Sequence, residues 1–333
     1  MRVAVLAGGR SSEHDVSLAG AAAVRDGLEQ AGHEVLWVEL ARDGKWTFAG
    51  SEVELRAGRG LLGADVVFPV LHGPFGEDGT IQGLLELLDV AYVGSGVLTS
   101  AVCIDKVAFK RFMAQAGLPQ VAFADIDVAR WAADRAGAEA EVAALGLPVF
   151  VKPARLGSSV GITRVTEPQA LADAIAQAHG HDPRAIVEAA AAGLEIECSV
   201  LGHPEDPQVS EPGEIRILGS VSPGGWYDYE AKYTPGGMEL VVPAAISATA
   251  RDRVQALAAE AFHASGCSGL ARADFFVDGE DVLLNELNTM PGFTPTSVYG
   301  QLWEASGLPY PQLVDRLITL AIERHERERG HSY

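Results

Sequence analysis

Apolar and polar positions follow two alternating periods along the chain, and their order predicts an α/β protein. Residues 2–7 form a largely apolar run that ends at Gly8 and Gly9, as expected for a buried parallel strand and the turn after it. Residues 17–30 repeat apolar side chains at the helical period, and residues 34–40 return to a strand pattern. This β-α-β order predicts an open, Rossmann-like first domain. Because the loop lacks the full G-x-G-x-x-G fingerprint, we do not expect a dinucleotide site there.

Residues 64–70 predict a further strand, which leads into a loop of unusual composition. Three glycines and a proline surround His72 and Glu77 within residues 71–82. Open α/β sheets bind their ligands beyond the carboxyl ends of the strands, so this loop is a candidate binding element. A purely structural histidine is the alternative.

After residue 94 the pattern changes, and a second unit of mixed helices and strands begins. Residues 100–116 predict one helix that contains Asp105 and Lys106. Residues 189–192 follow a strand and precede a glycine, and we interpret them as a hinge. The other expected elements of this unit are surface helices within 129–145, strands at 149–153, 162–165 and 185–188, and a helix at 168–178.

A third unit begins near residue 193 and ends with a helix over residues 311–328. Within it, residues 211–238 form a long segment that contains Gly and Pro. A loop of this length in a compact enzyme is usually a lid or a binding element. The three units predict domains at residues 1–94, 95–192 and 193–333.

Two apolar runs separated by the turn signal Asp-Gly-Glu-Asp predict a β-hairpin in the third unit. A five-residue loop over 278–282 would place Asp274 opposite Glu286. The same register would place Arg272 opposite Asn288, on the same face of the hairpin. Carboxylate and amide oxygens suit a Mg²⁺ site that leaves coordination positions open for phosphates. A solvated hairpin face is the alternative.

The chain is long enough for two or three domains, and its composition narrows the classes of function. Of its 333 residues, 48% are hydrophobic and 21% charged, as in a soluble globular protein. The net charge of −20 argues against nucleic acid or an anionic membrane as a partner. Three widely spaced cysteines predict neither disulfides nor a thiolate metal site, and with no signal peptide or membrane span evident we expect a cytoplasmic protein.

Residues 152–161 join two predicted strands through a turn of small residues. Successive backbone N–H groups and two hydroxyls in such a turn can surround phosphate oxygens, and Lys152 would supply a positive charge. The segment is no Walker loop, because no helix follows it and the lysine precedes the glycines. A simple hairpin with a Ser-Ser turn is the alternative.

A strand lysine, a Gly/Ser turn and an Asp/Glu/Asn strand pair together resemble the ATP-grasp superfamily. The closer resemblance is to the D-alanine–D-alanine ligases, and it covers essentially the whole chain. It implies an ATP-grasp fold of three domains, of class α/β with α+β units, in which nucleotide binds between the central and C-terminal domains. The motifs that carry it are residues 8–17, 72–82, 105–106, 152–161, 227–233, 272–274 and 286–297.

The resemblance implies a role for several residues in binding ATP. Lysines would neutralise the phosphates, amides of the Ser-Ser turn would cover them, a glutamate and the backbone after it would bind adenine, and a second glutamate would bind the ribose. Many relatives have a lysine and often an aromatic residue at positions 189 and 190, where this chain has alanines, so contact there must be mainly through the backbone. The residues in these roles are, in order, Lys106, Lys152 and Lys232; Ser158 and Ser159; Glu188 with Ala189 and Ala191; and Glu195.

The resemblance also implies the residues that perform the chemistry. Asp274, Glu286 and Asn288 would hold two Mg²⁺ ions, for which Mn²⁺ could substitute. Arg272 and the backbone N–H of Gly292 would stabilise the oxyanion of a tetrahedral intermediate. Glu13 would contact the ammonium of the first D-alanine, and His72 would lie near its carboxylate. Ser297 would hold the carboxylate of the second D-alanine, and Tyr227 is a further substrate residue. Tyr233 would hydrogen-bond Ser158, which in turn would reach Glu13.

These implications predict an ATP-dependent ligase that joins two D-alanines for peptidoglycan synthesis, expected as a homodimer through its first domain. The alternatives are a ligase for D-lactate or D-serine, or another ATP-grasp carboxylate–amine ligase. A Rossmann oxidoreductase would need the missing dinucleotide fingerprint. A two-lobed solute-binding protein would give no reason for the Asp/Glu/Asn strand pair.

Overall fold

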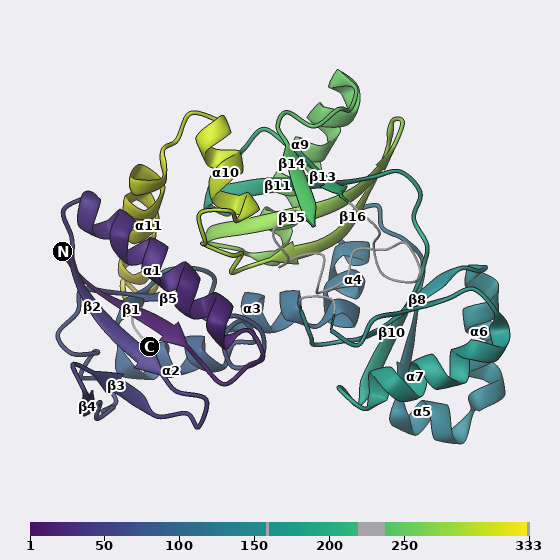
Figure 1. Ribbon diagram of the computed structural model, residues 1–333, viewed down its shortest axis with the longest axis horizontal. Helices are drawn as coiled ribbons and strands as arrows, with labels where there is room; N and C mark the ends of the chain where they lie inside the picture. The colour runs from purple at the N-terminus through teal and green to yellow at the C-terminus, as the bar shows by residue number, and fades with distance from the viewer. Residues whose placement is uncertain (158–159, 219–236, 332–333) are drawn as a thin grey trace.

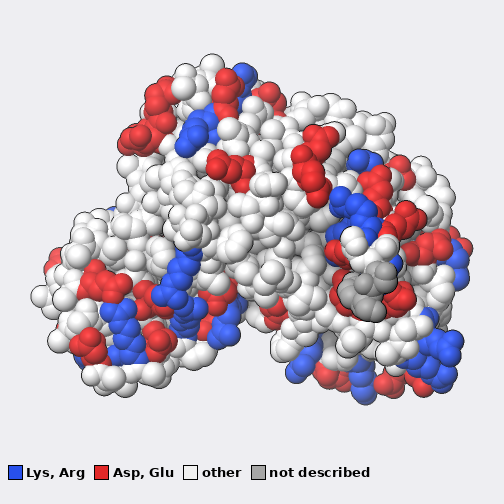
Figure 2. Space-filling model, turned by 180° about the vertical axis from the view of Figure 1, so that it is seen from behind, with Lys and Arg blue, Asp and Glu red and all other residues white. Residues whose placement is uncertain are grey.

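Three sheets, each with helices packed against it, make up the protein (Figure 1). The computed structural model describes residues 1–157, 160–218 and 237–331. No helix in these ranges combines the length and the apolar character needed to cross a membrane. On the face shown in Figure 2, charged side chains of both signs lie together over each of the three lobes.

The first sheet has the predicted parallel centre. Its strand order is β4-β3-β2-β1-β5-β6, in which β2, β1, β5 and β6 run parallel and β3 and β4 add an antiparallel edge. The strands are β1 (Arg2–Gly8), β2 (Glu34–Leu40), β3 (Trp46–Phe48), β4 (Ser51–Glu52), β5 (Val66–Pro69) and β6 (Ala91–Tyr92).

Helix α1 (His14–Gln30) begins three residues earlier than the periodicity predicts. The expected first residue, Ser17, is a buried helical residue whose hydroxyl connects β1 to the residue after β5. Gly8 N donates to Ser17 Oγ at 2.8 Å, and the hydroxyl donates to the carbonyl of Val70. Its polarity therefore marks a contact of the helix with the sheet rather than a helix start.

Helices pack on both faces of the first sheet, and one of them is a helix far along the chain, at Tyr310–Arg329. Val3 and Val5 pack with α1 and with Leu313 and Leu317 of α11 (Tyr310–Arg329). Ala4, on the opposite face, packs with α2 (Thr80–Leu88). Figure 1 shows α1 and α11 side by side over the sheet. The C-terminal helix is therefore part of the core around the N-terminal strands.

The second unit opens with two helices where one was expected at residues 100–116. Helix α3 ends at Ile104 (Val97–Ile104), and α4 (Lys106–Gln115) begins one residue later, after Asp105. Asp105 leaves the helical conformation, with φ −82° and ψ 100°, and its side chain accepts hydrogen bonds from the backbone N–H groups of Val107 and Ala108. The expectation was wrong because this N-cap interaction starts a new helix inside a continuous apolar pattern.

An antiparallel sheet follows, in the order β7-β10-β8-β9. As predicted, residues 152–161 connect two strands, β8 and β9, and no helix follows them directly. Helices α6 and α7 cover one face through a common core, and Val107 of α4 packs with Ala154 and Ile186. The elements are β7 (Phe123–Asp127), α5 (Val128–Ala133), α6 (Arg135–Leu145), β8 (Val149–Pro153), β9 (Thr163–Val165), the short 3₁₀ helix η1 (Pro168–Ala170), α7 (Leu171–His179) and β10 (Arg184–Ala189).

The third sheet has the order β14-β13-β11-β15-β16, and β12 also pairs with β11. Helix α9 covers one face through a large apolar core. The described ends of the expected loop 211–238 contain strand, which corrects that prediction; residues 219–236 lie outside the described residues. The elements are β11 (Leu194–His203), β12 (Asp206–Val209), β13 (Gly213–Ile217), β14 (Met238–Val241), α9 (Ala248–Ser265), β15 (Gly269–Asp278), β16 (Asp281–Asn288) and α10 (Val298–Ala305).

The β15–β16 hairpin has the predicted register at its functional end but not the predicted loop. Arg272 pairs with Asn288 and Asp274 with Glu286. The turn contains only two residues between the paired Asp278 and Asp281, and the register shifts between Asp274 and Phe275. The expected five-residue loop is therefore wrong. A bulge adds one residue to one strand and so restores the pairing that a longer loop would have given.

Candidate active site

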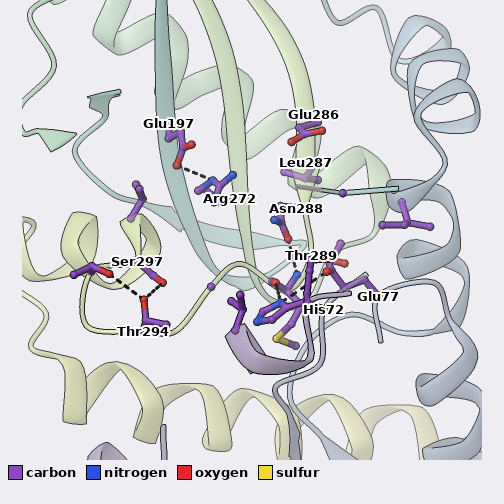
Figure 3. Close-up of a pocket in the computed structure, with 18 of the residues that line it drawn as sticks. His72, Glu77, Glu197, Arg272, Glu286, Leu287, Asn288, Thr289, Thr294 and Ser297 are labelled. Atoms are coloured by element: carbon purple, nitrogen blue, oxygen red, sulfur yellow. Dashed lines mark hydrogen bonds and ion pairs between the residues drawn. The ribbon is translucent and has the colours of Figure 1, made fainter. Parts of the chain in front are cut away.

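A cavity of about 790 Å³ lies between the first and third units, with one wall from the start of α4. Figure 3 shows the hairpin strands on one side and the loop after β5 on the other. The first unit contributes the start of α1 and the residues around His72, and the third contributes β11, β15, β16 and the segment that leads into α10. The predicted site residues that line this cavity are Glu13, His72, Lys106, Arg272, Glu286, Asn288, Gly292 and Ser297.

Arg272 lies between two carboxylates on the hairpin face. Its Nε and Nη2 each donate to Asp274 at 2.7 Å, and Nε lies 2.8 Å from Glu197 Oε2 (Figure 3). Burial opposes the charged guanidinium, but Asp274 and Glu197 more than offset this and raise the pKa of Arg272. Arg272 is therefore a fixed positive charge inside the cavity.

Glu197 was not predicted as a site residue. It lies on β11 directly opposite Asp274 of β15. The available signal was the alternation of Glu195 and Glu197 with apolar residues, which places two carboxylates on one face of a strand. The pattern does not reveal that the partner of Glu197 is Arg272, because that contact forms only when two strands pair.

Asp274, Glu286 and Asn288 present the oxygen atoms that a hard divalent cation prefers. The side chain of Glu286 is 34% exposed toward the cavity, and that of Asp274 is 13% exposed. Asn288 Oδ1 accepts a hydrogen bond from Met290 N at 3.0 Å, which fixes the amide. The described residues contain no group of three or more His, Cys, Asp or Glu side chains that could hold a metal ion.

A second group of charges lies beside the cavity, where α4 meets β8 and β10. Lys106 Nζ donates to the carbonyl of Leu156 at 2.7 Å and lies 4.0 Å from Glu286 Oε2. Lys152 Nζ lies 2.5 Å from Glu188 Oε2, and Lys110 Nζ lies 2.9 Å from Glu188 Oε1. Burial opposes ionisation of Glu188, but the two lysines outweigh it and lower the pKa of Glu188 to about 2.

His72 and two acidic side chains form the opposite end of the cavity. His72 Nδ1 lies 3.1 Å from the carbonyl of Met290 and 3.8 Å from Glu77 Oε1. Burial acts to lower the pKa of His72, but Glu77, the charge of Glu13 and the Met290 carbonyl together raise it above 6.5. Gly73 has φ +68°, and a Cβ there would lie 2.8 Å from Glu13 Oε2, so a glycine is needed beside this carboxylate.

Ser297 is held at the entrance to α10 by a neighbouring hydroxyl. Thr294 Oγ1 lies 2.7 Å from Ser297 Oγ and 3.2 Å from Thr296 Oγ1 (Figure 3). A Cβ on Gly292 would lie 2.7 Å from Ser297 Oγ, so a larger residue there would displace this hydroxyl. The Gly292 backbone and the Ser297 hydroxyl therefore lie within one compact turn.

The remaining predicted residues divide into two sets. Asp274, Lys152, Glu188, Ala189, Ala191 and Glu195 are described but are not among those that line the cavity; Ala189 ends β10 and Glu195 lies on β11. Ser158, Ser159, Tyr227, Lys232 and Tyr233 lie outside the described residues.

Two family models match the sequence. The D-ala D-ala ligase C-terminus model matches residues 112–319, and the D-ala D-ala ligase N-terminus model matches residues 2–60 and 49–95. The chain belongs to the D-alanine–D-alanine ligase family. This result confirms the resemblance on which the sequence interpretation depended and makes the chain a member of a family of ATP-dependent ligases.

Relatives in the D-alanine–D-alanine ligase family match nearly the full length. The D-alanine–D-alanine ligase of Kineococcus radiotolerans is 45% identical and covers 97% of both chains. That of Streptomyces coelicolor is 44% identical over 97% of this chain and 93% of its own.

Solved structures of this family confirm the ATP-grasp fold. The D-alanine–D-alanine ligase of Coxiella burnetii superimposes with a TM-score of 0.87, at 33% identity over 99% of this chain and 96% of its own. The VanG D-Ala:D-Ser ligase of Enterococcus faecalis gives a TM-score of 0.85, at 34% identity over 96% of this chain and 99% of its own.

Proposed function

We propose that this protein joins two molecules of D-alanine at the expense of ATP, for the synthesis of peptidoglycan precursors. The carboxylate of the first D-alanine is phosphorylated to D-alanyl phosphate. The amine of the second then attacks its carbonyl carbon, and the products are D-alanyl-D-alanine, ADP and phosphate. One observation carries the proposal: a single cavity is lined by two groups of residues from different units. Arg272, Glu286 and Asn288 come from the hairpin, and Glu13 and His72 come from the first unit.

The nucleotide occupies the side of the cavity next to α4, where Lys106 and Lys152 supply positive charge. Asp274, Glu286 and Asn288 would hold two Mg²⁺ ions, or Mn²⁺ in their place. These ions, when bound, offset the negative charge of the phosphates during phosphoryl transfer. With Asp274 engaged by a metal ion, Glu197 would remain the partner of Arg272. Glu188, Ala189, Ala191 and Glu195 lie along the β10–β11 segment proposed to bind adenosine.

The first D-alanine binds at the opposite end. Glu13 pairs with its ammonium group, and the raised pKa of His72 favours an imidazolium beside its carboxylate. When the second amine attacks, negative charge develops on the carbonyl oxygen. Arg272 and the N–H of Gly292 are the donors proposed to stabilise that charge.

The second substrate binds toward α10, with its carboxylate on Ser297. The Thr294 hydroxyl, 2.7 Å from Ser297 Oγ, orients that group. Ser158, Ser159, Tyr227, Lys232 and Tyr233 keep the roles that the family resemblance implies, and these stay predictions. The homodimer and the cytoplasmic location also stay predictions.

D-Serine is the second candidate for the attacking substrate, because a D-Ala:D-Ser ligase has nearly the same fold as this chain. The deciding experiment measures ADP release from ATP and Mg²⁺ with D-alanine alone, and then with D-serine or D-lactate added. Mass spectrometry identifies the product. We expect D-alanyl-D-alanine from D-alanine alone and little mixed product at equal concentrations. ADP release that does not require D-alanine would overturn the proposal, whereas mostly D-alanyl-D-serine would identify the sister activity.

A further inference from the structure

Lys110 is a buried lysine to which neither the sequence pattern nor the proposed chemistry assigns a role. It lies on α4 one turn after Lys106, and its side chain is 1% exposed. Fully buried lysines are rare in proteins and occur almost only with a charged partner. Here the partner is Glu188, whose side chain is 4% exposed.

Glu188 receives one lysine on each carboxylate oxygen. Lys152 pairs with Ile186 in the β8–β10 ladder, and Phe150 pairs with Glu188. Lys152 and Glu188 are therefore diagonal neighbours on one face of the sheet. Lys110 approaches from α4, and its Nζ reaches the other oxygen at 2.9 Å. The cluster contains two cations and one anion.

The two lysines differ in what else they can reach. The side chain of Lys152 is 14% exposed. Burial acts to lower the pKa of Lys152, but Glu188 raises it, and the charges of Glu286 and Glu195 raise it further. Lys152 therefore faces the nucleotide side as well as Glu188. Lys110 Nζ lies 2.9 Å from Glu188 Oε1, and the side chain is 1% exposed, so it is closed to solvent.

We propose that Lys110 is a positioning residue that acts as the permanent counter-ion of Glu188, and so allows Lys152 to turn from Glu188 to a phosphate oxygen of ATP. Without Lys110, the same movement would leave a buried carboxylate unpaired, which is strongly unfavourable. Lys152 would then stay on Glu188, and affinity for nucleotide would fall. This inference rests on the proposed function for the identity of the nucleotide.

The main test is a set of binding measurements with the full chain. Lys110→Gln keeps a hydrogen-bond donor but removes the charge. We expect its dissociation constant for a non-hydrolysable ATP analogue with Mg²⁺, measured by calorimetry, to rise by about tenfold or more. The matched control is Lys45→Gln, because Lys45 is 66% exposed and pairs with Asp43 on the surface. This control should bind the analogue like the wild type.

A double substitution separates positioning from simple structural support. In a Glu188→Gln background there is no carboxylate to leave unpaired, so adding Lys110→Gln should not weaken analogue binding further. An equal loss of affinity in both backgrounds would overturn the inference, as would wild-type affinity in Lys110→Gln. Failure of the wild type to bind the analogue would instead overturn the proposed function.

A measurement on the wild type follows Lys110 and Lys152 directly, and variants are needed only to assign the signals. With only five lysines, ¹³C-lysine labelling should give separable Cε signals, assigned by the five single lysine substitutions. Addition of the analogue should shift the Lys152 signal strongly and the Lys110 signal little. A Lys152 signal that does not move, or a larger shift at Lys110, would contradict the inference.

Discussion

Glu197 and Arg272 join two neighbouring strands inside the cavity, with Glu197 Oε2 2.8 Å from Arg272 Nε. The guanidinium also donates two hydrogen bonds to Asp274, so one arginine is shared between a residue proposed as a metal ligand and one that is not. Glu197 therefore determines how tightly Arg272 holds Asp274.

We expect Glu197→Gln to strengthen the hold of Arg272 on Asp274, because the neutral amide competes poorly for the guanidinium. The concentration of Mg²⁺ needed for half-maximal ADP formation should then rise by several fold. Mn²⁺ binding followed by electron paramagnetic resonance should weaken in parallel. Glu239→Gln, an exposed glutamate on β14, is the control. An unchanged metal affinity in Glu197→Gln would remove Glu197 from this role.

Glu286→Ala should lower the rate of ADP formation by several orders of magnitude, because it removes a proposed metal ligand. Its side chain is 34% exposed, so thermal unfolding should stay close to that of the wild type. Asp274→Ala should lose activity similarly but also some stability, since Arg272 loses two hydrogen bonds. Asp278→Asn at the exposed end of the same hairpin is the control. Near-normal turnover of Glu286→Ala at saturating Mg²⁺ would contradict the site assignment.

His72 predicts a pH dependence of both stability and substrate binding. Its folded-state pKa is raised above 6.5, so its contribution to the free energy of unfolding is complete below about pH 6.5 and is lost as the pH rises through the folded-state pKa. Affinity for the first D-alanine should fall over the same window, because the imidazolium beside its carboxylate loses its charge.

Two pH series test this prediction. Denaturant unfolding and the KM for the first D-alanine are both measured from about pH 5.5 to pH 9, across the histidine range. In His72→Gln, both curves should lose their step above pH 6.5. The control is His263→Gln, a histidine that contacts Pro204 at the surface. Identical curves for wild type and His72→Gln would show that the charge of His72 does not change over this range and would contradict the prediction.

Thr294→Val should raise the KM for the second D-alanine by several fold, because Ser297 loses the hydroxyl that orients it, a contact of ordinary hydrogen-bond strength. The KM for the first D-alanine should not change. Thr296→Val is a close control, since its hydroxyl contacts Thr294 at 3.2 Å. A parallel rise in both KM values would indicate a general disturbance of the turn.

The sequence predicted the elements around the site well where a period repeats over several residues. The parallel strands and the functional pairs of the hairpin are confirmed. The hairpin shows that a correct pairing does not require a correct turn, since a two-residue turn and a bulge together give the same register. At Asp105 the apolar pattern predicted one continuous helix, which was wrong. The Asp105 side chain caps the start of α4, so two helices form where the pattern continues without a break.

The partners of buried charges could not be predicted from the sequence. Lys110 and Glu197 each occupy a position that periodicity marks only as a polar residue in a helix or strand. Their partners, Glu188 and Arg272, lie 78 and 75 residues away along the chain. Such contacts depend on how sheets and helices are placed in three dimensions, which no local pattern records.

Helix α11 has a consequence for how the chain is made on the ribosome. Its side chains Leu313 and Leu317 complete the core of the first sheet, whose strands emerge from the ribosome long before α11. During translation that face therefore lacks part of its cover until α11 has been synthesised. We expect a nascent chain truncated before Tyr310 to be digested by protease within its N-terminal strands and to need a chaperone. A helix whose synthesis begins 218 residues after the first sheet ends (Tyr92 to Tyr310) thus allows that sheet to finish folding.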